Sequence, residues 1–79
     1  MTATMKTMEL VYADNLTPDQ LMIEDLIRIG DDIVEVLGIE SDGDGSMYYV
    51  AYQNEFGEKD VIQYLHTELI PLYAFLEEE

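Results

Sequence analysis

The stretch DIVEVLGIESDGDGSMYYVAYQ, residues 32–53, predicts two strands joined by a tight turn. Residues 32–40 are rich in β-branched side chains, which favour a pleated strand. Residues 41–45 contain two Asp-Gly pairs, and Asp-Gly supplies the positive φ that a hairpin turn needs. Residues 46–53 are apolar and aromatic and form the clearest strand pattern of the chain. Gly38, inside the first of these strands, predicts a bulge or a sharp bend.

Strand patterns continue on both sides of this hairpin. They share short apolar and β-branched runs, at residues 8–13, 24–29, 59–65 and 72–76. Gly30-Asp31 and residues 54–58 predict turns, and residues 66–70 predict a helical turn before the last strand. The chain therefore predicts an all-β fold of five to six strands with short helical turns. A sheet this small must curl to cover its core, so the expected architecture is a small barrel.

Residues 17–29 allow two interpretations. Thr17, Pro18 and Gln20 form a capping-box pattern, which predicts a helix that runs through Arg28. The β-branched residues and the alternation at residues 25–29 favour instead a turn or a single helical turn, followed by a strand from residue 24. We prefer the second interpretation, and the sequence leaves both open.

Seventy-nine residues are enough for one domain. We predict a disordered N-terminal arm at residues 1–7, a β-barrel domain at residues 8–76 and an acidic tail at residues 77–79. The absence of cysteine fits a reducing cytoplasm. No apolar run approaches the roughly 20 residues of a membrane span, and the first seven residues lack the apolar part of a signal peptide. These features predict a soluble, cytoplasmic protein that does not bind membranes.

The net charge is the unusual feature of the composition. Eighteen Asp and Glu residues stand against Lys6, Arg28 and Lys59, which gives a formal charge of −15. A compact domain of this length is about 30 Å across, and duplex DNA of that length carries about 18 charges. A surface that contacts phosphates needs clustered Lys and Arg, so the sequence excludes direct nucleic-acid binding. The acidity either keeps the chain soluble or forms a functional negative surface, and both explanations stay open.

The order of strands and turns in residues 25–60, DLIRIGDDIVEVLGIESDGDGSMYYVAYQNEFGEKD, resembles that of SH3-like barrels. Two strands flank a Gly-Asp turn, and the second leads through a Val-x-x-Ile pattern into a polar hairpin. Residues 21–65 loosely resemble the N-terminal barrel of the elongation factor P group, and they are similar to short acidic proteins encoded by bacteriophages. The resemblance implies an SH3-like barrel. It carries no activity, because the loop lysine and the RNA-facing basic residues of those translation factors are missing here.

The side chains that catalysis or metal binding requires are scarce. His66 is the only histidine and there is no cysteine, so neither a nucleophile–base–orienter triad nor a zinc site can be composed in the usual way. Residues 42–46 begin like a calcium loop, but loop position 12 is Gln53 rather than a bidentate acid. We therefore predict that the chain is not an enzyme and has no metal or cofactor.

The candidate binding residues are acids in the expected turns and two adjacent tyrosines. Tyr48 and Tyr49 must face opposite sides of their strand, so one ring points away from a single core. That ring either covers a neighbouring strand or anchors a partner. The candidate set is Asp31, Asp32, Asp42, Asp44, Glu55, Glu58, Tyr48 and Tyr49.

Two functions fit these features. The first is a non-enzymatic acidic module that binds a basic or nucleic-acid-binding protein, with a charge that mimics nucleic acid. The alternative is a structural or assembly protein, such as a viral one, that self-associates through barrel edges. The sequence does not indicate the oligomeric state.

Overall fold

The computed structural model describes residues 7–78, and its six strands lie in one antiparallel sheet. The strand order across the sheet is β1-β6-β2-β3-β4-β5. The strands are β1 (Thr7–Leu16), β2 (Leu26–Ile29), β3 (Asp32–Ser41), β4 (Met47–Gln53), β5 (Lys59–Leu65) and β6 (Ile70–Glu78). A short 3-10 helix, η1 (Pro18–Gln20), follows β1. The prediction of an all-β fold with five to six strands and short helical turns is confirmed.

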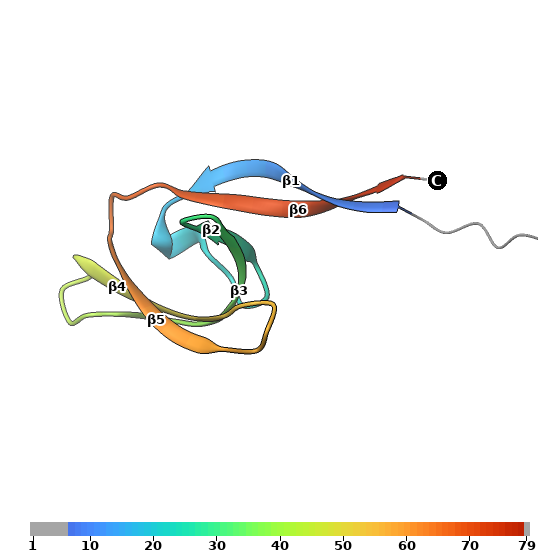
Figure 1. Cartoon of the computed structure of the whole chain (residues 1–79). Coiled ribbons are helices and arrows are strands. Elements are labelled where there is room, and N and C mark those ends of the chain that lie inside the picture. Colours follow the sequence, from blue (N-terminus) through green and yellow to red (C-terminus); the bar gives the residue numbers. More distant parts are fainter. Residues whose placement is uncertain (1–6, 79) are drawn as a thin grey trace, which may run out of the picture.

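The sheet curls on itself, and β1 and β6 form a long ribbon that projects beyond the curled part (Figure 1). This ribbon pairs from Thr7 with Glu78 to Leu16 with Ile70. Within residues 7–78 no ladder joins β1 to β5, so these two strands are the edges of the sheet. The radius of gyration is 14.8 Å, above the roughly 11–12 Å of a compact chain of this length. The charge is therefore spread over a longer body than the composition suggested.

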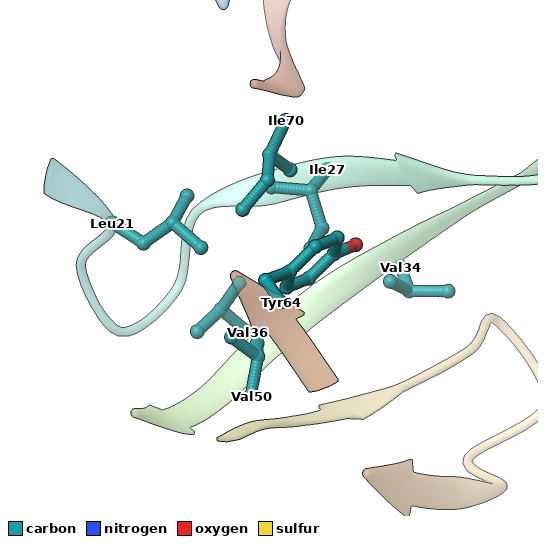
Figure 2. Packing of buried hydrophobic residues seen from close by; sticks show 7 residues of the cluster. All are labelled: Leu21, Ile27, Val34, Val36, Val50, Tyr64 and Ile70. Carbon is teal, nitrogen blue, oxygen red and sulfur yellow. The ribbon is translucent and has the colours of Figure 1, made fainter. Parts of the chain in front are cut away.

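The core lies inside the curl of the sheet, and each strand that contributes to it does so with the side chains of one face. Its buried side chains are Leu21, Ile27, Val34, Val36, Val50, Tyr64 and Ile70. Figure 2 shows these side chains converging, with the ring of Tyr64 among the aliphatic groups. Burial, and then the charge of Glu68, raise the pKa of Tyr64. The strand pattern of the sequence thus places one face of the sheet away from water.

A bulge in β3 lets this strand bend around the core. The register between β3 and β4 shifts between Val36, opposite Tyr52, and Gly38, opposite Ala51. The extra residue reverses the alternation, so that Val36 is buried and Ile39, three residues later, packs against the same core. The bulge predicted at Gly38 is confirmed.

The segment between β1 and β2 is a helical turn followed by a strand. The N–H of Thr17 donates to Oε1 of Gln20 at 3.2 Å, which is one half of the predicted capping box. The helix nevertheless ends at Gln20. Glu24 has a φ of 79°, a left-handed conformation. Its N–H donates to the carbonyl of Val36 at 2.8 Å and the N–H of Val36 donates to the carbonyl of Asp25 at 2.8 Å, so two residues lie opposite one and the regular ladder starts after this bulge. The regular strand β2 begins at Leu26, two residues after the predicted start at about residue 24.

The ends of the chain differ from the predicted boundaries. Thr7 pairs with Glu78 and Met8 with Glu77, so strand structure extends into both predicted tails. Residues 1–6 and Glu79 lie outside the described residues. The turn predicted as helical at residues 66–70 is a simple turn, and Ile70 already belongs to β6. No helix within residues 7–78 is long and apolar enough to cross a membrane.

Candidate binding groove

An open groove of about 860 Å³ is formed by the β1–β6 ribbon together with two hairpin turns and the strands beside them. We call it the acidic groove. Five of its lining residues are apolar, five are acidic, and none of them is basic. The lining residues are Leu10, Leu26, Asp31, Asp32, Ile33, Glu35, Gln53, Asn54, Glu55, Phe56, Gly57, Glu58 and Phe75. The groove thus combines an apolar surface with negative charge and contains no positive charge.

The apolar part of the groove comes from three separate regions of the chain. Leu10 and Phe75 are opposite each other in the ribbon, and both are exposed. Leu26 of β2 and Ile33 of β3 are half-buried. Phe56, at the tip of the β4–β5 turn, is 80% exposed. An exposed phenyl ring beside other apolar side chains is typical of a surface that binds a partner.

The carboxylates come from the two turns and from β3. Asp31 and Asp32 lie at the β2–β3 turn, which Gly30 opens with a φ of 62°. Glu55 and Glu58 lie in the β4–β5 turn. All four side chains are exposed, and all four line the groove. Four of the predicted acidic residues therefore meet at one groove.

Asn54 holds the β4–β5 turn in its conformation. Its Oδ1 accepts hydrogen bonds from the N–H groups of Phe56 at 2.9 Å and Glu58 at 3.0 Å. Its Nδ2 donates to Oε1 of Glu58 at 2.9 Å. Gly57 has a φ of 79°, which closes the turn without steric cost. The turn thus presents Phe56 and Glu58 in a preformed arrangement, which lowers the entropic cost of binding.

The middle of the groove contains one further acid. Glu35 of β3 is half-buried and pairs in register with Gln53 of β4. Nε2 of Gln53 donates to Oε1 of Glu35 at 2.7 Å. This bond fixes one carboxylate oxygen and leaves the other available to a donor from a bound partner.

Asp42 and Asp44, by contrast, do not line the groove. They lie in the β3–β4 turn, where the hydroxyl of Ser46 donates to Oδ1 of Asp44 at 2.7 Å and its N–H donates to Asp42 at 3.1 Å. These hydrogen bonds stabilise the hairpin. Among the described residues, no group of three His, Cys, Asp or Glu side chains is placed to hold a metal ion. The resemblance of this turn to a calcium loop is explained by its role in the hairpin.

The hydrogen bonds from Ser46 lower the pKa of Asp44 from 3.8 to about 2. Because the folded-state pKa is depressed, the stabilisation from this carboxylate is present above pH 3.8 and is lost as the pH falls towards 2. We predict that the carboxyl carbon of Asp44 titrates near pH 2 in an NMR experiment. Replacing Ser46 with alanine removes the largest cause and moves this midpoint towards 3.8. Identical midpoints in the two proteins would contradict the assignment.

Tyr48 and Tyr49 occupy opposite faces of β4, as their adjacency predicted. Tyr48 is half-buried and lies opposite Ser41 and Tyr64 in the sheet. Tyr49 lies opposite Glu40 and Gln63 and is 37% exposed. Neither ring lines the acidic groove. The structure therefore does not bring the two tyrosines together with the four acids of the groove.

The apolar residues of the groove were missed by sequence reasoning. Leu10, Leu26, Ile33 and Phe75 follow the ordinary strand pattern, so nothing in their neighbourhood distinguishes them from core residues. Phe56 did carry a signal, because a large aromatic residue inside a polar turn has no local role in the turn. An aromatic residue at a turn tip is a reason to look for a binding surface.

Comparison of the chain with protein-family models, with curated proteins and with solved structures finds no match in any of the three. The resemblance to SH3-like barrels of bacteriophages and of the elongation factor P group stays a prediction.

Proposed function

We propose that this chain is a non-enzymatic acidic binding module for a basic or nucleic-acid-binding protein. The acidic groove receives a cationic segment that also carries an apolar side chain. The carboxylates of the two turns contact Lys or Arg side chains, and the apolar side chain packs on the phenyl ring of Phe56. In this proposal the module acts in the cytoplasm and binds neither nucleic acid nor membranes directly.

The composition of the groove lining is the observation that supports the proposal. Five carboxylates surround apolar side chains with no basic residue among the lining, which matches a partner with positive charge around an apolar residue. The net charge of −15 attracts such a partner at long range and speeds association, in a manner that salt weakens. The surface with which a protein binds the phosphates of nucleic acid is also positively charged. An acidic module can therefore bind such a surface in place of nucleic acid.

Affinity capture with two charge-matched variants tests this proposal. The groove variant carries Asp31→Asn, Asp32→Asn, Glu55→Gln and Glu58→Gln. The control variant loses the same number of charges elsewhere, through Glu9→Gln, Asp14→Asn, Glu24→Gln and Glu40→Gln. We expect the unmodified chain and the control to retain basic proteins from a lysate at low salt and to release them at about 0.5 M sodium chloride. The groove variant is expected to retain at most a tenth as much.

Two results would contradict the proposal. Recovery of no basic or nucleic-acid-binding protein at any salt concentration excludes the function itself. Equal loss in both variants shows that net charge, and not the groove, attracts the partner. Folding of every variant is checked by circular dichroism before the capture.

A second candidate function is structural: a component of an assembly, for example a viral one, that self-associates through sheet edges. The edge of β1, which no other strand of residues 7–78 pairs on its outer side, favours it. Light scattering at high protein and salt concentrations separates the two functions, because an assembly component forms oligomers there and a binding module does not.

A further inference from the structure

The open edge of β5 presents a defined set of backbone N–H groups. At one end of the β4–β5 ladder the N–H of Asn54 donates to the carbonyl of Glu58 at 2.9 Å. At the other end the N–H of His66 donates to the carbonyl of Ser46 at 3.0 Å. Hydrogen-bonded pairs alternate along an antiparallel ladder, so even-numbered residues of β5 bond to β4. The N–H groups of Lys59, Val61, Gln63 and Leu65 therefore point to the open edge.

Two of these four outward-pointing N–H groups donate hydrogen bonds to carboxylates of the same chain. The N–H of Val61 donates to Oδ1 of Asp60 at 2.8 Å. The N–H of Leu65 donates to Oε1 of Glu68 at 3.1 Å. The other edge strand shows a similar contact, since the N–H of Asn15 donates to Oδ1 of Asp14 at 2.8 Å. Hydrogen bonds to an ionised acceptor are stronger than those to a neutral one, so a pairing strand does not displace them easily.

Apart from these contacts, β5 has the features of an edge strand with which a further strand can pair. The side chain of Val61 is 57% exposed and that of Leu65 is 49% exposed. The segment KDVIQYL is rich in β-forming residues and its outer edge is unpaired. Two copies related by a two-fold axis at Gln63 would place Val61 of one copy opposite Leu65 of the other. That arrangement uses the two N–H groups that the carboxylates occupy.

We propose that Asp60 and Glu68 guard the edge of β5 by bonding its outward amides, which prevents a second copy of the chain from pairing there. The guard acts in two ways. Each carboxylate removes a donor that the incoming strand needs, and the carboxylates of both copies repel each other across the new interface. This inference does not depend on the acidic groove, whose lining contains neither residue.

The double variant Asp60→Ala with Glu68→Ala tests the guard. We expect its mass in light scattering to rise from the 9.1 kDa of one chain towards twice that value, at concentrations where the unmodified chain stays a monomer. The control variant Glu24→Ala with Glu40→Ala loses the same charge away from β5 and is expected to stay a monomer. Adding Gln63→Pro to the double variant should restore the monomer, because proline removes an outward donor and leaves the bonds to β4 intact. A monomeric double variant, an equally associated control or no effect of proline would overturn the proposal.

Hydrogen exchange in the unmodified chain gives a test that needs no variant. The amides of Val61 and Leu65 should exchange at least about tenfold more slowly than that of Gln63, after correction for sequence effects, although all three point outwards. Equal exchange rates would show that the carboxylates do not hold these amides in solution, and would overturn the proposal.

Discussion

Replacing Ile27 with alanine is expected to lower the free energy of unfolding by about 3 kcal/mol, within the range observed for Ile→Ala in protein cores. Ile27 is 0% exposed and lies on β2, which pairs with both β3 and β6. The short strand is held on two sides, so the sheet cannot collapse to fill the cavity that the substitution leaves. A domain this small has a total stability of only about 5–10 kcal/mol, so the loss should be evident in a urea titration.

Ile23→Ala is the matched control for this prediction. Ile23 is the same residue type, but it is 64% exposed and lies in the turn before β2. Its replacement should change the free energy of unfolding by less than about 0.5 kcal/mol. Similar losses for Ile23 and Ile27 would contradict the placement of Ile27 in the buried core.

Replacing Phe56 with alanine is expected to weaken binding of a cationic peptide about tenfold, which corresponds to the loss of one aromatic contact of moderate strength. The probe is a fluorescent peptide, GKRFKRG, whose dissociation constant is measured by anisotropy at low salt. Phe56 is 80% exposed, so its removal has little effect on folding. The backbone N–H groups of residues 56 and 58 still donate to Oδ1 of Asn54 in this variant, so the turn keeps its conformation. The change therefore isolates the apolar part of the groove.

Leu69→Ala provides the control for Phe56. Leu69 is 64% exposed but is not among the residues that line the groove. Its replacement removes a comparable exposed apolar side chain and should leave peptide affinity unchanged. If the Phe56 variant binds the peptide as tightly as the unmodified chain, charge alone attracts the peptide and the groove has no apolar anchor.

Most strands could be predicted because their pattern is local. β4, from Met47 to Gln53, is rich in aromatic and β-branched residues and ends in turns that contain glycine. The boundaries were less predictable, because pairing partners decide them. β1 extends to Leu16 because β6 pairs with it as far as Ile70. The start of β2 at Leu26 follows from the bulge at Glu24 and Asp25 opposite Val36, which no local pattern indicates.

The candidate site was predictable only in part. Exposure is a local property of acids in turns, so the sequence is sufficient to predict Asp31, Asp32, Glu55 and Glu58. Asp42 and Asp44 satisfied the same criterion, yet they bond to Ser46 in another turn. The order of the strands separates these two groups, because in the antiparallel series β2-β3-β4-β5 the β2–β3 and β4–β5 turns lie at one end of the strands and the β3–β4 turn lies at the other.

The amino-acid sequence by itself determined the all-β class, the hairpin turns, the bulge in β3 and the large negative charge. Each of these depends on side chains within a few residues of each other or on composition, so local conformational preference is sufficient to specify it. The tertiary structure alone decided which acids share a groove with Phe56 and which strand edges stay open. Those features depend on contacts between residues far apart in the chain, such as Leu10 with Phe75, and on the direction in which the sheet curls.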